Sequence, residues 1–339
     1  MPTTIAFFDV TPKEKVSFEH YFTGSKFKVL LFSEPIGNIP AYDYKSAEII
    51  SIYTTSHVDS TILAHTPKLK LIACRSTGFD NVDINTCQKR KIAVCNVPGY
   101  GQTTVAEYAI MLMLMTVRKM PAVLKAVTEG HIDYNHLTGT TLHGKTLGVI
   151  GTGKIGLSVI EIAKSMGMHI VAYDPYPNEQ AAKNLGFSYI KIRDLFKGAD
   201  IISLHAPLTP DTKHIVDSKA LKLMSEHSVL INTARGELIE TQALIEALRT
   251  HQIAAAALDV IEGERTIDGD IENDLFRANK EILFEIAEID ILSKMNNVIL
   301  SPHNAFNSNE ALHFIRKTTA ENINAFLAGK PQNVVELKI

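Results

Sequence analysis

The chain of 339 residues carries 34 Lys and Arg against 37 Asp and Glu, a formal net charge of −3, and 45% of its residues are hydrophobic. This composition is typical of globular proteins and excludes a disordered or collagen-like chain. The balanced charges provide no basic surface for nucleic acid, so we expect no nucleic-acid partner. At about 150 residues per domain, the length predicts two domains.

Cysteine usage and the apolar segments indicate a reducing compartment. Cys74, Cys87 and Cys95 are too few for a disulfide framework in so long a chain, and their spacing matches no zinc-binding pattern. The first fifteen residues lack the pattern of a signal peptide. The longest apolar run, residues 108–117, has about half the ~20 residues that span a bilayer and predicts a buried helix. We therefore expect a cytoplasmic protein that binds no metal and contacts no membrane.

Short β-rich runs alternate with helical patterns along almost the whole chain. The predicted strands, in chain order, are residues 5–10, 49–53, 69–74, 92–95, 146–150, 170–173, 201–204, 229–232, 255–258 and 298–300. The predicted helices include about 103–128, 155–166, 218–224, 241–249 and 309–327. This alternation predicts parallel βαβ units, and hence an α/β fold with open, doubly wound sheets.

The order of the elements also predicts how the two domains share the chain. The long helix near residue 103 precedes a series of six strands, and the last helix has no strand after it. The chain can leave the first domain near residues 98–101, build the second, and return near residue 305. We therefore expect a first domain of residues 1–100 and 305–339, interrupted by a second of residues 101–304. Ligand sites would then concentrate in a cleft between the domains.

A glycine-rich turn follows the first strand of the second domain. Residues 146–156 read TLGVIGTGKIG, a buried strand that leads through Gly151, Gly153 and Gly156 into a helix. In this pattern the first glycine permits the tight turn, the second admits a pyrophosphate close to the backbone, and the third allows close helix–strand packing. The helix N-terminus adds free N–H groups and a positive dipole. The turn predicts a dinucleotide site.

Asp174 ends the next predicted strand, 18 residues after Gly156, where the ribose-binding acid of this motif is expected. A carboxylate there accepts hydrogen bonds from the ribose hydroxyls and repels a 2′-phosphate. No Arg or Lys occurs in residues 175–180. The expected cofactor is therefore NAD rather than NADP.

Polar motifs follow the later strands of the same domain. Arg235, Glu264 and His303 come after three different strands, whose carboxyl ends lie at one edge of a parallel sheet. Arginine can bind a carboxylate with two hydrogen bonds, histidine can transfer a proton, and a neighbouring glutamate favours the charged histidine. These three residues predict a catalytic group. His205, after a fourth strand, is assigned with equal weight to the cofactor groove and to a structural role.

Eight segments together resemble the D-isomer-specific 2-hydroxyacid dehydrogenase family. They are RSTGFDNVD, NVPGYGQTTVAEYA, GTGKIG, YDPYPN, SLHAPLTPDT, INTARGELI, ALDVIEGE and SPHNAF, and the resemblance covers nearly the whole chain. It implies a flavodoxin-like substrate domain into which a Rossmann NAD-binding domain is inserted. It also implies NAD-dependent reduction of a small 2-keto acid to the D-2-hydroxy acid, and the reverse reaction.

The resemblance assigns roles to individual residues. It makes Arg235 the carboxylate-binding arginine, Glu264 the partner of the histidine, and His303 the proton-transferring residue. The implied substrate-binding residues are Ser76, Thr77, Gly78, Tyr100 and Phe306, with hinge packing as the alternative for Tyr100. The implied cofactor-binding residues are Gly151, Gly153, Lys154, Ile155, Gly156, Asp174, His205, Ala206, Pro207, Thr212, Thr233, Ala234 and Asp259. Family members commonly dimerise through the region of the long helix, so a homodimer is expected.

One departure from the family pattern concerns the substrate. Glu264 and His303 are 39 positions apart, farther than in most members, and residues 281–292 of the extra segment form a helical pattern. D-lactate dehydrogenases of the family also carry a long segment here, which favours pyruvate and lactate. The helix could instead only cover the cofactor domain. The alternatives left open are a glyoxylate or hydroxypyruvate reductase, a D-2-hydroxyisocaproate-type dehydrogenase and, from another class, an NAD-sensing corepressor that binds peptide partners.

Overall fold

The computed structural model describes residues 2–263 and 280–335, and its chain forms two compact units. Unit 1 comprises Met1–Gly101 and Asn307–Ile339, and unit 2 comprises Gln102–Phe306. The chain therefore passes from one unit to the other twice. No helix in the described part of the chain is long and apolar enough to cross a membrane.

Unit 1 is built on a five-stranded parallel sheet with the strand order β2-β1-β3-β4-β5. This is the flavodoxin-like order, and it reverses between β1 and β3. Ile5 of β1 lies opposite Val29 of β2 and Ile49 of β3. The strands are β1 (Thr3–Phe7), β2 (Phe27–Leu31), β3 (Ile49–Ile52), β4 (Leu71–Cys74) and β5 (Ala93–Cys95).

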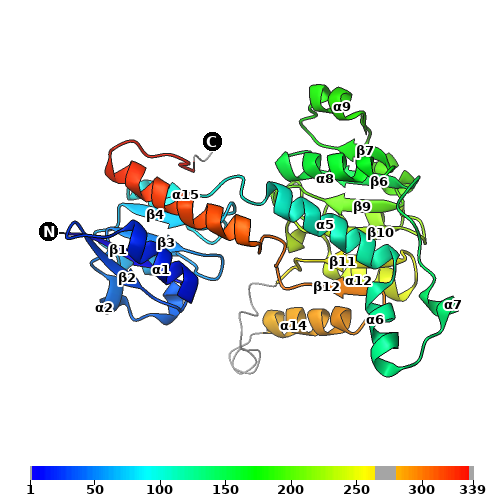
Figure 1. The fold of residues 1–339 in the computed structure, drawn as a ribbon, viewed down its shortest axis with the longest axis horizontal. Coiled ribbons are helices and arrows are strands. Elements are labelled where there is room, and N and C mark those ends of the chain that lie inside the picture. Colours follow the sequence, from blue (N-terminus) through cyan, green and yellow to red (C-terminus); the bar gives the residue numbers. More distant parts are fainter. Residues whose placement is uncertain (1, 264–279, 336–339) are drawn as a thin grey trace. The chain divides into compact units, whose positions relative to one another are not determined.

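Helices cover both faces of this sheet and bury two separate apolar clusters. The last helix, α15, packs against α1 and β4 although it is far from both in sequence (Figure 1). The side chain of Asn322 in α15 fixes this return by donating a hydrogen bond to the Asn96 carbonyl, 2.8 Å away. The helices are α1 (Pro12–Tyr21), α2 (Ala41–Tyr44), α3 (Ser60–Ala64), α4 (Ile84–Lys89) and α15 (Asn309–Leu327), with a 3-10 turn at Ile36–Asn38.

Unit 2 contains a seven-stranded parallel sheet with the order β12-β11-β10-β9-β6-β7-β8. This is the Rossmann order extended by one strand, and it reverses between β6 and β9. Val149 of β6 lies opposite Ala172 of β7 and Ser203 of β9. The strands are β6 (Thr146–Ile150), β7 (His169–Tyr173), β8 (Ser188–Tyr189), β9 (Ile201–Leu204), β10 (Val229–Asn232), β11 (Ala255–Leu258) and β12 (Val298–Leu300).

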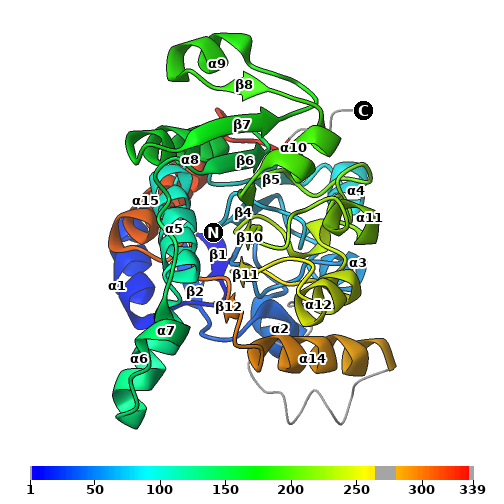
Figure 2. The ribbon, with the colours of Figure 1, turned by 90° about the vertical axis from the view of Figure 1, so that its right-hand side faces the viewer.

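The central strands of this sheet are buried on both faces, as their continuous apolar sequences predict. Figure 2 shows α5 and α8 on one side of the sheet and α10, α11 and α12 on the other. The helices are α5 (Gln102–Val117), α6 (Met120–Glu129), α7 (Tyr134–Leu137), α8 (Lys154–Ser165), α9 (Glu179–Leu185), α10 (Ile192–Gly198), α11 (Ser218–Leu221), α12 (Thr241–Arg249) and α14 (Lys280–Ser293), with a 3-10 turn at Gly236–Leu238.

Both sheets confirm the predicted fold class, but some elements differ from the prediction. The helix expected over residues 103–128 is two helices, because Lys119 adopts the left-handed backbone conformation with φ = +50° and ends the first. Pro121 then stands in the first turn of α6, where a proline is well tolerated. The strands β2 and β8 were not predicted. Both lie at sheet edges. β8 is only two residues long, whereas β2 has the apolar sequence FKVLL and was overlooked.

Candidate active site

The glycine-rich turn connects β6 to α8 at the point where the strand order reverses. Gly151 has φ = +93°, and a Cβ atom there would lie 2.6 Å from the backbone of His205 and Ala206. A Cβ atom on Gly156 would collide with the Gly151 carbonyl. Gly153 precedes α8 and makes no side-chain cap, and its Cβ direction opens on space without an atom within 4 Å. No side chain of the described residues therefore crowds the backbone of Gly153 at the N-terminus of α8, which suits the close approach of a pyrophosphate.

Asp174 follows β7 and is held against this turn. Its Oδ2 accepts hydrogen bonds from the Thr152 backbone N–H at 2.7 Å and the Thr152 hydroxyl at 3.0 Å, and its Oδ1 accepts one from Tyr176 N–H. The Thr152 hydroxyl is also 2.8 Å from the Tyr189 hydroxyl, which accepts from Asn178 N–H. An ionised carboxylate has about four acceptor positions and three are used here, so Oδ1 of Asp174 keeps one position for a ribose hydroxyl.

Two of these contacts were not predicted from the sequence. Thr152 lies within the GTGKIG motif, where the motif itself could have drawn attention to it. Tyr189 comes from β8, which is two residues long and carries no readable pattern.

The segment after β9 lies on the other side of the reversal point. Ala206 is buried, Pro207 is exposed, and the Thr212 hydroxyl closes its own turn through the Pro207 carbonyl. Nε2 of His205 is 2.8 Å from the Ser203 hydroxyl. Its Nδ1 is buried with no hydrogen-bond partner in the described part of the chain. Burial lowers the pKa of His205 to about 4, so this ring is neutral near pH 7.

This buried histidine predicts a pH-dependent loss of stability. Between about pH 6.5 and pH 4 the unfolded chain binds a proton at His205 that the folded chain does not. The free energy of unfolding should therefore fall with decreasing pH across this window, by on the order of 3 kcal/mol. Urea unfolding of the wild type and of His205→Gln at pH 7 and pH 4.5 measures this loss. The variant should lose less, and equal losses would contradict the prediction.

Arg235 follows β10 in a turn that a buried side chain shapes. Asn232 is fully buried, donates from Nδ2 to the Arg235 carbonyl at 2.7 Å, and accepts from Ala234 N–H at 3.0 Å. The Arg235 side chain is half-buried, and its Nη1 donates to the Ala234 carbonyl. The hydroxyl of Thr233 in the same turn is buried, and no hydrogen-bond partner for it lies among the described residues.

Asp259 after β11 holds the turn that carries His303 after β12. Its carboxylate accepts hydrogen bonds from the Ser301 hydroxyl at 2.5 Å and from the Asn304 and Ala305 N–H groups at 2.8 Å. Its carbonyl accepts from His303 N–H at 2.8 Å, and His303 has φ = +48°. Burial raises the pKa of Asp259, while these hydrogen bonds and His303 oppose that shift. Asp259 thus fixes the left-handed backbone conformation of His303. The family resemblance assigns Asp259 to cofactor binding and does not predict this contact.

The strand order brings the candidate catalytic turns together. β10, β11 and β12 are neighbours, so Arg235, Asp259 and His303 follow the carboxyl ends of three adjacent strands. The ring of Phe306 lies edge-on to that of His303, with centroids 6.4 Å apart. Glu264 lies outside the described residues.

An unpredicted pair connects the loops around these turns. Nε2 of His214, in the segment after β9, is 2.8 Å from Oε1 of Glu262, in the segment after β11. Gly236, next to Arg235, has its backbone against Ile261, and a Cβ atom there would collide with it. The segments after β9, β10 and β11 therefore support one another.

The predicted substrate loop lies in unit 1, directly after β4. The Ser76 hydroxyl donates to the Gly78 carbonyl at 2.6 Å, and the Thr77 hydroxyl donates to the Val97 carbonyl at 2.9 Å. Asn96 donates to the Thr77 carbonyl at 2.7 Å. Thr77 is exposed and Gly78 is half-buried, so the loop is both held in place and accessible. Tyr100 is half-buried beyond β5 in the same unit.

These features define the class of protein. A Rossmann sheet, a glycine-rich turn that opens on free space and an acid after the second strand fit NAD, and arginine and histidine follow strands of the same sheet. Lys154 and Ile155 begin α8, directly after Gly153. The class is an NAD-dependent dehydrogenase.

Comparison with known proteins assigns the family. Residues 110–305 match the model of the D-isomer specific 2-hydroxyacid dehydrogenase NAD binding domain. The D-lactate dehydrogenase of Escherichia coli is 37% identical over 84% of this chain and 84% of its own, and a glyoxylate reductase of Thermococcus litoralis is 36% identical over 86% and 85%. The chain belongs to the D-isomer-specific 2-hydroxyacid dehydrogenase family.

Solved structures agree with this assignment. The crystal structure of a D-lactate dehydrogenase from Aquifex aeolicus, complexed with NAD and lactic acid, superimposes with a TM-score of 0.87. It is 30% identical and covers 96% of this chain and 96% of its own. The protein is therefore a D-2-hydroxyacid dehydrogenase that uses NAD.

Proposed function

We propose that the protein is a D-lactate dehydrogenase (EC 1.1.1.28) that reduces pyruvate with NADH and also catalyses the reverse reaction. The observation that supports this most directly is its likeness, over nearly the whole chain, to a D-lactate dehydrogenase solved with NAD and lactic acid. The long segment between Glu264 and His303 agrees with that type. The second candidate is a glyoxylate or hydroxypyruvate reductase, which the glyoxylate reductase relative supports.

The proposed mechanism assigns a separate task to each residue. The backbone of Ser76–Gly78 and the guanidinium of Arg235 bind the carboxylate of the keto acid, and Arg235 also polarises its carbonyl. Bound NADH supplies the hydride for C2 of the keto acid. His303, held by Asp259, donates the proton to the carbonyl oxygen, and Glu264 stabilises the charged imidazole. Phe306 and Tyr100 border the substituent on C2.

The decisive experiment is a kcat/KM comparison with NADH across pyruvate, glyoxylate, hydroxypyruvate, phenylpyruvate and 2-ketoisocaproate. Pyruvate should give the highest value. A highest value with glyoxylate or hydroxypyruvate would support the second candidate, and one with 2-ketoisocaproate would support a D-2-hydroxyisocaproate-type enzyme. NADH binding without turnover of any keto acid would instead support an NAD-sensing binding protein.

Asp174 is expected to set the preference for NADH over NADPH. Its carboxylate, held by Thr152, would repel a 2′-phosphate, so kcat/KM should favour NADH by at least about 10²-fold. Asp174→Ala should narrow this gap mainly by weakening NADH, because the hydrogen bonds to the ribose are lost. Steady-state kinetics with both cofactors measures the effect, and Asp194→Ala, at an exposed position of α10, is the control. Equal kcat/KM values for both cofactors in the wild type would refute the assignment.

We propose further that the protein works in the cytoplasm as a homodimer that forms through α5, α6 and α7. α6 has no buried residue, and large apolar side chains are exposed along these helices. A groove of about 480 Å³ adjoins them and is lined largely by apolar side chains, including Met111 and Leu114. Apolar surface concentrated in this way marks protein–protein interfaces.

Sedimentation equilibrium tests the dimer. The wild type at micromolar concentration should have twice the 37.4 kDa mass of one chain. Leu124 and Val127 are 57% and 63% exposed on one side of α6, so the double replacement Leu124→Glu with Val127→Glu should give the monomer. Val16→Glu, at the equally exposed Val16 of α1, should leave the dimer intact. A wild-type mass of 37.4 kDa would refute the proposal.

A further inference from the structure

A buried arginine lies where the strand order of the five-stranded sheet reverses. Asp9 follows β1, Tyr53 follows β3, and Arg75 follows β4, so all three stand at the carboxyl edge of the sheet. Ligands of open α/β sheets bind at this edge, near the reversal point. Arg75 is completely buried there and directly precedes the Ser76–Gly78 loop.

The guanidinium of Arg75 contacts several segments at once. Its Nη2 donates hydrogen bonds to the carbonyls of Phe8 and Asp9, the second at 3.0 Å. Its Nε lies 3.3 Å from Oε1 of Glu14, which is also buried. The guanidinium carbon stands 5.6 Å from the ring centre of Tyr53. Arg75 therefore connects the β1 and β3 ends to the start of the loop after β4.

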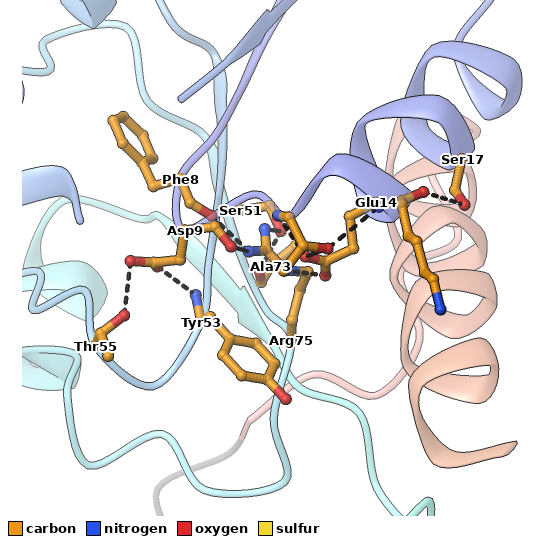
Figure 3. A network of polar contacts seen from close by, with 11 residues as sticks. Phe8, Asp9, Glu14, Ser17, Ser51, Tyr53, Thr55, Ala73 and Arg75 are labelled. Carbon is orange, nitrogen blue, oxygen red and sulfur yellow. Dashed lines mark hydrogen bonds and ion pairs between the residues drawn. The ribbon is translucent and has the colours of Figure 1, made fainter. Parts of the chain in front are cut away.

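Asp9 extends these connections to the segment after β3. It has φ = +54°, and its carboxylate accepts hydrogen bonds from Tyr53 N–H at 3.0 Å and from the Thr55 hydroxyl at 2.7 Å (Figure 3). Burial raises the pKa of Tyr53, and Tyr100 adds to that shift, so the two phenols lie within electrostatic reach of each other. The same network thus holds Tyr53 and the start of the Ser76–Gly78 loop.

The charges of this network carry a cost that apolar residues would avoid. Burying an arginine and a glutamate removes both from water, and replacing such a pair by packed apolar residues is often neutral or stabilising. A gain in stability therefore does not explain why the Arg75–Glu14 pair occurs at the carboxyl edge of the sheet. The pair instead contributes defined geometry, because the planar guanidinium of Arg75 holds several hydrogen-bond partners in fixed positions.

We propose that Arg75, paired with Glu14, is a positioning residue that sets the geometry of the Ser76–Gly78 loop and of Tyr53 for the 2-keto acid. This inference rests on the proposed function, because it assumes that the Ser76–Gly78 loop binds the carboxylate of the keto acid. Arg75 itself is buried and acts through the segments that it holds.

Three variants test this role. Arg75→Lys keeps the charge but loses the fork. Glu14→Gln removes the charge of the ion pair, and glutamine at this position still completes the capping box that Glu14 forms with Thr11 at the start of α1. The double variant Glu14→Gln with Arg75→Met removes both charges together. Arg90→Lys is the matched control, because Arg90 also donates to two carbonyls in unit 1, those of Leu63 and Thr66, but caps α4.

KM for the keto acid, the Kd of NADH and the thermal midpoint are measured for each protein. Arg75→Lys should raise KM by about 10- to 100-fold, since small misplacements of a binding group cost this much, with the Kd of NADH unchanged. Glu14→Gln should raise KM in the same direction. The double variant should regain thermal stability relative to Arg75→Lys while its KM stays high. Arg90→Lys should lose stability at wild-type KM.

A purely structural role would give the opposite pattern, with KM returning to the wild-type value as stability returns. A wild-type KM in Arg75→Lys or in the double variant would overturn the proposal, and if the double variant does not fold, KM of Glu14→Gln decides. The assays use the best keto acid of the wild-type panel. If the proposed function is wrong, the wild type itself fails to reduce the keto acids. If only the positioning role is wrong, the wild type is active and the Arg75 variants have the same KM as the wild type.

Discussion

His303→Ala is expected to lower kcat/KM by roughly 10²–10⁴ in both directions, the usual contribution of a positioned acid–base group. The reduction of a keto acid needs a proton donor at the carbonyl oxygen, and oxidation of the hydroxy acid needs an acceptor there. Asp259 fixes the His303 backbone at φ = +48° through the hydrogen bonds of the 301–305 turn, so the imidazole is presented from a rigid support. Kinetics with pyruvate and NADH, and with D-lactate and NAD, measure both directions.

Two controls separate this effect from a general loss of structure. The Kd of NADH should be unchanged in His303→Ala, because the glycine-rich turn and Asp174 lie at other strands of the sheet. His313→Ala replaces an exposed histidine of α15 and should retain wild-type activity. Added imidazole should partly restore turnover of the alanine variant. A loss of less than 10-fold would remove His303 from the proton-transfer role.

The agreement between sequence and structure is best where strands are buried on both faces. The bounds of β6, β9, β10 and β11 coincide with the predicted ranges, since each is a short, largely buried apolar run that ends at polar or turn residues. The bounds of β12, a half-buried edge strand, coincide as well. The edge strand β8 is only two residues long and could not be recognised, whereas β2 (FKVLL) carries an apolar run that the prediction missed. The break between α5 and α6 depends on the left-handed conformation of Lys119, which no sequence pattern announces. Pro121 could have indicated that a new helix starts there.

The same reasoning explains which parts of the site the sequence could indicate. Arg235, Glu264 and His303 could be grouped from the sequence because residues after parallel strands share one edge, and the structure brings Arg235 and His303 to that edge, while Glu264 lies outside the described residues. The contacts that hold them could not be predicted, because they join positions with no shared pattern. His214 meets Glu262, and Arg75 meets Glu14, only once the strand order is known.

Arg235→Lys is expected to lower kcat/KM for the keto acid by roughly 10- to 100-fold, with a rise in KM and a fall in kcat. Lysine keeps the charge but lacks the planar fork that binds a carboxylate with two hydrogen bonds. The loss of carbonyl polarisation lowers kcat, and the loss of carboxylate binding raises KM. Steady-state kinetics with pyruvate and NADH, together with the Kd of NADH, measure these changes.

The turn around Arg235 makes this replacement a clean test. Asn232 holds the backbone of Ala234 and Arg235 through its own buried side chain, so the lysine variant should keep the same backbone. The Kd of NADH should therefore stay near the wild-type value. Arg249→Lys on the exposed end of α12 is the matched control and should leave kcat and KM unchanged. Near-normal turnover in Arg235→Lys would mean that the keto acid does not depend on this guanidinium, and the carboxylate would then have to be bound by the Ser76–Gly78 loop alone.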